Sequence, residues 1–182
     1  WSSDVCSSDL ARTIKPSTIG AEAPPPRQRW LCREEVVAFW QGLSEGGFHP
    51  AQSNCLRLIL LTGVRRGEAT GMTWDQITGN KWVIPASNAK NGKEHTVILH
   101  ALALEIIAYQ RALSSGSPWV FEAIREHEAG QGHIDGNALR WVINKVRALH
   151  LPQSDPFTVH DLRRTFASRS EEHTSELQSP MF

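Results

Sequence analysis

The stretch LLTGVRRGEATGMTWDQI, residues 60–77, contains the change of pattern that decides the fold. It begins at the end of an apolar run, which Gly63 interrupts. Because glycine readily adopts the left-handed conformation that ends helices, we expect a largely buried helix over residues 51–62. A second, short helix is expected over residues 65–72, so that a pair of arginines follows the break directly.

Further elements are expected on both sides of this stretch. Apolar residues recur at helical spacing in three other segments, residues 33–43, 101–113 and 137–149. Residues 81–84 and 96–99 have the composition of strands, with a polar turn between them at residues 88–92. Thr158 is placed to cap a final helix. The pattern therefore predicts a mainly α domain with a small antiparallel β-sheet inserted.

The two ends of the chain are expected to have a separate origin. WSSDVCSSDL, residues 1–10, and RSEEHTSELQ, which begins at Arg169, can be encoded by opposite strands of one DNA segment that resembles a sequencing-library adapter. We therefore set residues 1–10 and 169–182 aside as adapter-derived tails. Residues 11–28 contain the run PPP without apolar periodicity, as expected of a linker. Residues 29–168 are expected to form a partial domain, cut at both ends.

Composition narrows the choice of partner and compartment. The whole chain has 19 basic and 19 acidic residues, but the tails contain five acidic residues and one basic residue. Residues 11–168 therefore carry 18 basic and 14 acidic residues, a net charge of +4, which weakly favours a nucleic-acid partner. Cys32 and Cys55 lack the spacing of a metal site or a disulfide framework, which favours a reducing cytoplasm. No apolar run approaches the length of a membrane span.

Three separated segments carry a family resemblance. They are LLTGVRRGEATGMTWDQI at residues 60–77, KWVIPASNAKNGKEHTVIL at residues 81–99, and FTVHDLRRTFAS at residues 157–168. In this order they resemble the TGxR box, the lysine-bearing strand–turn–strand and the HxxR box of tyrosine recombinases, the phage-type integrases. An HxxR pattern alone is a weak signal, but three boxes on suitable elements form a strong one. The resemblance implies the tyrosine-recombinase catalytic-domain fold, incomplete at its C-terminus.

The resemblance also implies a chemistry, which is DNA integration or excision through a 3′-phosphotyrosyl intermediate without a metal or other cofactor. Arg65 and Arg163 would hold the scissile phosphate, because fixed cations stabilise the charged transition state more than the ground state. His160 would contact the phosphate and act in general acid–base catalysis, and Lys90 would protonate the leaving 5′ oxygen. These four residues are the predicted catalytic set.

Alternatives stay open within each box. Arg66 is the alternative to Arg65, although the family spacing places the key arginine directly after TGx. Lys93 lies in the same turn as Lys90 and is the alternative there. We expect Glu68 to brace the short helix through a buried hydrogen bond or ion pair rather than to perform chemistry.

Several aromatic residues and histidines have structural interpretations. In the family the nucleophilic tyrosine follows the HxxR box, whereas the one tyrosine of this sequence, Tyr109, precedes it. We therefore expect Tyr109 to pack in the fold, and the chain to be inactive alone without its nucleophile. We expect core positions for three tryptophans, Trp74, Trp82 and Trp141. The histidines and acidic residues near His127 and His133, which include Glu126 and Glu128, match no metal-binding spacing.

The resemblance finally implies partners. The parent protein is expected to act as a homo-tetramer on double-stranded DNA at attachment sites, in a bacterial or phage-encoded setting and not at a membrane. Residues 11–28 would then be the linker from a core-binding domain. The main alternative is a non-catalytic DNA-binding module on the same fold. A type IB topoisomerase-like enzyme is less favoured, because the sequence HDLRRT is typical of prophage integrases.

Overall fold

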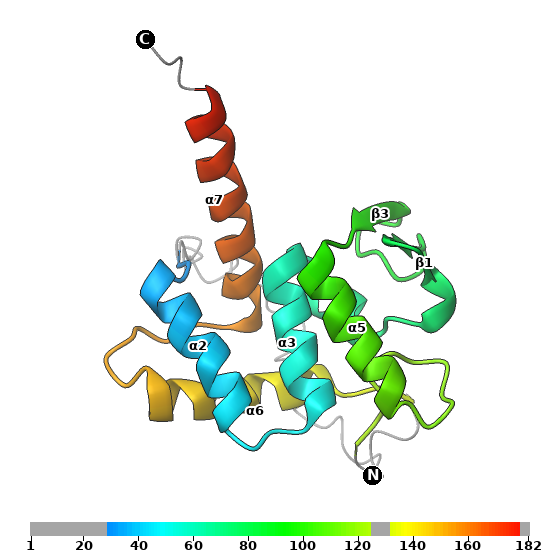
Figure 1. Ribbon diagram of the computed structural model, residues 1–182, viewed down its shortest axis with the longest axis horizontal. Helices are drawn as coiled ribbons and strands as arrows, with labels where there is room; N and C mark the ends of the chain where they lie inside the picture. Colours follow the sequence, from blue (N-terminus) through cyan, green and yellow to red (C-terminus); the bar gives the residue numbers. More distant parts are fainter. Residues whose placement is uncertain (1–28, 125–131, 179–182) are drawn as a thin grey trace, which may run out of the picture.

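The computed structural model describes residues 29–124 and 132–178, with side chains as far as residue 170. Most of the chain is helical, and a small sheet lies at one side of the helices (Figure 1). The helices are α2 (Arg33–Glu45), α3 (Pro50–Thr62), α4 (Arg66–Thr70), α5 (Ala101–Leu113), α6 (Gly136–His150) and α7 (Val159–Gln178). The strands are β1 (Ile77–Thr78), β2 (Lys81–Ile84) and β3 (His95–Ile98), and β1 follows a short 3-10 helix, η2 (Trp74–Gln76). The predicted fold class is confirmed.

Helix α3 lies at the centre of the helical part and packs against α2, α5, α6 and α7 (Figure 1). Its apolar residues are almost completely buried, as the unbroken run in the sequence indicates. The helix ends at Gly63, which has a φ of 64° and donates its N–H to the Ile59 carbonyl at 2.9 Å. This left-handed turn directs the chain into α4, and thereby places Arg65 and Arg66 at the surface of the helical layer.

The sheet is antiparallel, in the order β1-β2-β3. Trp82 lies opposite Ile77 on one side and Val97 on the other. Its side chain is completely buried and donates a hydrogen bond from Nε1 to Gln76 Oε1 at 3.0 Å. Strand β1 was not predicted, because Gly79 and Asn80 indicate only a turn at this place. The sheet therefore has one strand more than the two that were expected.

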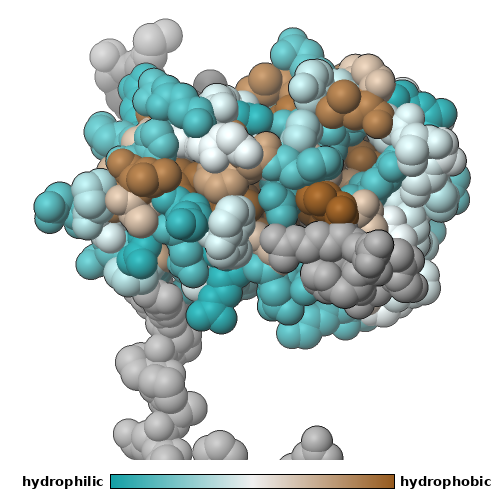
Figure 2. All heavy atoms as spheres, turned by 90° about the horizontal axis from the view of Figure 1, so that it is seen from below, coloured by the Kyte–Doolittle hydropathy of each residue, from teal (hydrophilic) through white to brown (hydrophobic). Residues whose placement is uncertain are grey.

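Helix α6 buries the predicted apolar face, which consists of Leu139, Val142, Ile143 and Val146. Asp135 caps the helix by accepting a hydrogen bond from the Asn137 N–H at 3.0 Å. Trp141 was expected in the core, but this prediction is wrong, because its side chain is 50% exposed and meets Phe48 edge-on. The lower side of the molecule, along which α6 runs in Figure 1, is largely hydrophilic with separate hydrophobic patches (Figure 2).

Helix α7 begins after Thr158, as predicted, and its far end stands clear of the other elements (Figure 1). Asp161 accepts hydrogen bonds from the Thr158 N–H and hydroxyl, both at 2.9 Å, so the carboxylate closes the first turn. Thr165 accepts a hydrogen bond from the Leu31 N–H at 2.9 Å and donates to the Asp161 carbonyl at 2.8 Å. The helix continues through residues 169–178, which belong to the predicted adapter-derived tail of residues 169–182.

A partly buried polar network joins the start of α2 to the loop before α7. Glu35 accepts hydrogen bonds from Arg29, from the Ser154 hydroxyl and from the Cys32 N–H. Burial raises the pKa of Glu35, but these hydrogen bonds and the Arg29 charge outweigh that effect and lower the pKa to about 2. The network therefore favours an ionised carboxylate at this junction.

Both cysteines of the described residues are free thiols. Cys32 is exposed and Cys55 is buried. Burial raises the pKa of the Cys55 thiol. Among the helices of the described ranges, none is both long and apolar enough to cross a membrane.

Candidate active site

The four residues of the predicted catalytic set line one cavity of about 820 Å³. Arg65 lies at the start of α4, Lys90 lies in the turn between β2 and β3, and His160 and Arg163 lie on the first turns of α7. The fold thus brings the three sequence boxes to a single place. The volume lies in the usual range for ligand sites in proteins. We call this cavity, with its lining residues, the cationic cavity.

Arg65 is held in place by Glu68. The Glu68 carboxylate accepts one hydrogen bond from the Arg65 N–H and another from Arg65 Nη1, both at 2.8 Å. Glu68 is only 3% exposed, whereas the Arg65 side chain is 35% exposed, so the guanidinium reaches from a buried anchor into the cavity. The expectation that Glu68 braces this helix is confirmed. Its carboxylate both closes the first turn of α4 and fixes the direction of the arginine.

Lys90 is supported by a tight turn between β2 and β3. The buried Ala89 donates its N–H to the Pro85 carbonyl at 3.1 Å, and its own carbonyl accepts from the Gly92 N–H at 2.9 Å. Lys90 is exposed and lines the cationic cavity, whereas Lys93 is not among its lining residues. The geometry therefore favours Lys90 over Lys93 as the lysine of this site.

His160 and Arg163 lie on one face of α7, as their spacing of three residues requires. His160 is exposed, and Arg163 is partly buried. Asp161, which lies between them, is buried and engages Thr158 and Arg164, the latter at 3.5 Å. Among the described residues, no carboxylate lies within ion-pair distance of Arg163, which leaves its guanidinium available to an anion in the cavity.

Two further arginines line the same cavity. Arg66, the alternative to Arg65, follows it at the start of α4, and Arg140 reaches the cavity from α6. Sequence reasoning did not single out Arg140, and no motif in the sequence marks it. The residues that line this cavity therefore include five lysines and arginines and a single carboxylate, that of Glu68. An anionic ligand would be stabilised by the resulting field.

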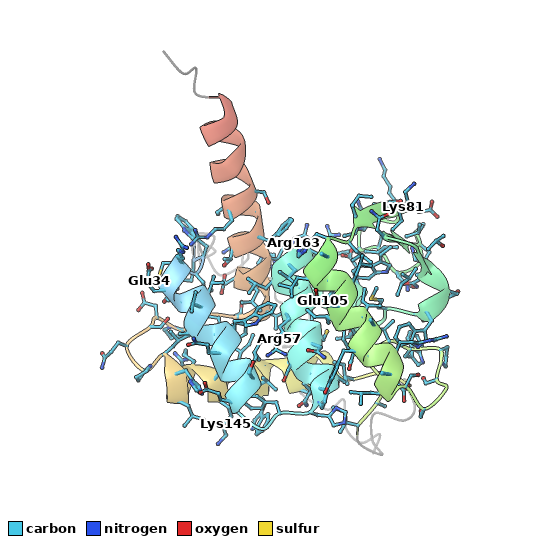
Figure 3. The ribbon with its side chains drawn as sticks, in the orientation of Figure 1. Glu34, Arg57, Lys81, Glu105, Lys145 and Arg163 are labelled. Carbon is cyan, nitrogen blue, oxygen red and sulfur yellow. The ribbon has the colours of Figure 1, made fainter. Side chains whose placement is uncertain are left out.

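Tyr109 lies outside the cationic cavity. It is 53% exposed on α5 and lines a separate cavity of about 430 Å³ together with Arg57 and Glu105. The expectation that Tyr109 is a packing residue is therefore wrong, although its position agrees with excluding it from the catalytic set. Figure 3 shows that Arg57 and Glu105 come from the neighbouring helices α3 and α5.

The histidine-rich loop offers no metal cluster within the residues that the structure describes. His133 contacts the Trp119 ring edge-on, with the ring centres 4.8 Å apart. Glu126, His127 and Glu128 lie outside the described residues.

Comparison with known proteins identifies relatives among prophage integrases. The model of the phage integrase family matches residues 29–179. Prophage integrase IntA of Escherichia coli (strain K12) is 41% identical over 64 residues, which cover 34% of this chain and 16% of the relative. Prophage integrase IntZ of the same organism is 30% identical over 99 residues, covering 53% of this chain and 24% of the relative. The chain thus spans a quarter or less of these two relatives.

Solved structures agree in fold. XerH site-specific recombinase bound to difH substrate has a TM-score of 0.63 at 17% identity, over 81% of this chain and 44% of that chain. The Tn1549 transposon integrase in complex with circular intermediate DNA has a TM-score of 0.66 at 12% identity, over 88% and 58%. A lambda integrase tetramer bound to a Holliday junction has a TM-score of 0.65 at 19% identity, over 91% and 50%. Because the family model matches residues 29–179, which are most of this chain, the chain belongs to the phage integrase family, and it has the fold of a tyrosine recombinase catalytic domain.

Proposed function

We propose that the cationic cavity binds the scissile phosphodiester of double-stranded DNA, and that the parent protein carries out site-specific integration or excision by transesterification there. The observation that carries this proposal is the meeting of Arg65, Lys90, His160 and Arg163 in one cavity. They come from three elements that are distant in the sequence. Residues 29–168 form the partial catalytic domain in this proposal, and residues 11–28 are the linker that precedes it.

Arg65 and Arg163 supply the fixed positive charge. A phosphodiester under attack passes through a pentacoordinate state with additional negative charge on its non-bridging oxygens. Guanidinium groups hold such oxygens with paired hydrogen bonds and stay ionised. Because Glu68 already orients Arg65, little reorganisation is needed when the charge develops. Loss of one such donor should raise the barrier by about 3 kcal/mol, roughly a hundredfold in rate.

Lys90 and His160 handle protons in this scheme. A tyrosine oxygen attacks phosphorus, the bond from phosphorus to the 5′ oxygen breaks, and a 3′-phosphotyrosyl link forms. Lys90 gives a proton to the departing 5′ oxygen, and His160 accepts the proton of the attacking hydroxyl. Religation by a 5′ hydroxyl reverses these steps, so the scheme requires neither ATP nor a metal ion.

The scheme needs a tyrosine that lies outside the residues described here. Tyr109 lines a different cavity, so it does not fit this role. We infer that the parent supplies the nucleophile and assembles as a homo-tetramer on two DNA duplexes, as the lambda integrase tetramer on a Holliday junction supports. The bacterial cytoplasm, where such DNA is found, is the proposed location.

The first experiment measures equilibrium binding of this chain to a fluorescent DNA duplex at increasing salt concentrations. The logarithm of the binding constant should fall linearly with the logarithm of the salt concentration, because the DNA releases counterions when the protein binds its phosphates. The Arg65→Ala/Arg163→Ala double variant should bind more weakly and with a smaller salt slope than the wild type. The matched control is Lys145→Ala, which removes an exposed cation from α6, outside the cavity (Figure 3). Equal salt slopes for the double variant and the control would refute the proposal.

A second experiment separates catalysis from simple DNA binding. A nicked duplex is incubated with the chain, and covalent adducts are sought on a denaturing gel. We expect no adduct from this chain and a phosphotyrosyl adduct from the complete parent protein. An adduct at Tyr109 would overturn the assignment of the nucleophile. Absence of an adduct from the parent would favour the non-catalytic DNA-binding module.

A further inference from the structure

We propose that Arg66 and Arg140 together hold a second phosphate, the neighbour of the scissile phosphate on the same strand. This inference rests on the proposed function and extends it, because it assigns two residues outside the predicted catalytic set. It also predicts that the cationic cavity takes two consecutive phosphates of DNA rather than one.

The charge of the cavity is the first reason. Arg65, Lys90 and Arg163 carry three positive charges, and Glu68 removes one, which leaves two. Two positive charges already match a phosphorane-like state with two negative charges. Arg66 and Arg140 are therefore a surplus for a single phosphate. Since each strand of duplex DNA carries one negative charge per about 3.4 Å of the helix axis, the next phosphate on the same strand is near enough to take up that surplus.

The position of Arg66 is the second reason. A Cβ atom at Gly136 would lie 2.7 Å from Arg66 Nε and 2.9 Å from its Cδ, so the arginine lies directly against the first turn of α6. Glycine at this place is what allows the close approach. Arg140 follows Gly136 by four residues and therefore lies on the same face of α6, one turn further along. The two guanidinium groups thus share the α6 side of the cavity.

The absence of counter-charges is the third reason. Arg66 and Arg140 are both exposed, and within the described part of the chain neither has a carboxylate at ion-pair distance. Two like charges on the same side of one cavity repel each other, and a bound anion would relieve this repulsion. The planar guanidinium group of an arginine donates paired hydrogen bonds to phosphate oxygens, so two arginines can bind one phosphate from two sides. DNA phosphate is therefore the ligand that fits this pair.

The test uses the salt dependence of DNA binding with the chain as it stands. The Arg66→Ala/Arg140→Ala double variant should lower the slope of log affinity against log salt by about 0.9, which corresponds to one phosphate. The Arg66→Lys/Arg140→Lys double variant keeps the charge and should keep the slope. Lys145→Ala is again the control, with no change expected. The same result is expected on two duplexes of unrelated sequence, since phosphates carry no sequence information.

Each other outcome has a distinct meaning. If the alanine pair behaves as Lys145→Ala does while Arg65→Ala/Arg163→Ala lowers the slope, this inference fails and the proposed function stands. If neither pair changes the slope, the proposed function fails as well. A decrease of about 1.8 would place the two arginines on separate phosphates and overturn the shared site. A loss that is confined to one of the two duplexes would indicate contact with bases and would also overturn it.

Discussion

Replacing Glu35 with glutamine should remove a defined part of the acid dependence of folding stability. The Glu35 carboxylate accepts hydrogen bonds from Arg29, Ser154 and the Cys32 N–H. Burial alone would raise its pKa, but these partners lower the pKa from 4.5 to about 2 in the folded protein. The partners are separated in the unfolded chain, where the carboxyl returns to its ordinary pKa. Folding and protonation of Glu35 are therefore linked.

The size and sign of the effect follow from this pair of pKa values. The difference between 4.5 and about 2 corresponds to about 3 kcal/mol of folding free energy. Because the folded-state pKa is the lower one, the stabilisation is complete above pH 4.5 and is lost as the pH falls towards 2. By pH 3, about 2 kcal/mol of it should be gone. Glu35→Gln should thus be less stable than the wild type by up to about 3 kcal/mol at pH 7, and the difference should shrink in acid.

Urea denaturation followed by circular dichroism, at a series of pH values from 7 to 3, measures this effect. The matched control is Glu105→Gln, which neutralises an exposed glutamate on α5 that has no ion pair among the described residues (Figure 3). The control should differ from the wild type by a small amount at every pH. If the difference between Glu35→Gln and the wild type stays constant over this range, the assignment of the network as the cause is wrong.

Three further substitutions test the site and its supports, each by urea denaturation at pH 7. Glu68→Ala removes two hydrogen bonds to Arg65 and should cost about 2–4 kcal/mol, with weaker DNA binding; unchanged stability would contradict the bracing role. Gly63→Ala places a Cβ 2.3 Å from the Phe166 ring at a φ of 64° and should cost about 1–3 kcal/mol. Leu139→Ala empties a completely buried position on α6 and should cost about 2–5 kcal/mol; a loss below 1 kcal/mol would contradict the described packing.

The long elements could be predicted from the sequence because their apolar spacing reflects the side that each one buries. The bounds of α5 are those predicted, and the predicted apolar face of α6 is buried from Leu139 to Val146. The buried run before Gly63 and the left-handed turn at that glycine are also confirmed. In these segments a local pattern and the tertiary packing give the same result.

Other features depend on information that no short stretch of sequence contains. Strand β1 has two residues, which is too short for an alternating pattern, and it is defined by its pairing with β2, in which Ile77 lies opposite Trp82 and Thr78 opposite Lys81. Trp141 and Tyr109 are large aromatic residues, yet both side chains are exposed to solvent, so residue type alone led to a wrong prediction. Hydrophobicity predicts burial on average but not for each side chain.

The candidate site also contains residues that the sequence could predict and one that it could not. Arg65, Lys90, His160 and Arg163 could be selected from the sequence because each lies in a box with a recognisable spacing. Arg140 has no such box, and it reaches the cavity only because α6 packs across the start of α4. A residue of this kind can be found only when the packing of the helices is known.

The hydrogen bond from the Leu31 N–H to Thr165 gives this domain a path for mechanical load. Tension on the backbone ahead of α2 reaches α7 through that bond, and Arg163 lies on the same helix, two residues earlier. Lys90 lines the same cavity from a different element, the turn between β2 and β3. Any displacement of the segment ahead of α2 is therefore coupled to the helix that supplies His160 and Arg163 to the cavity.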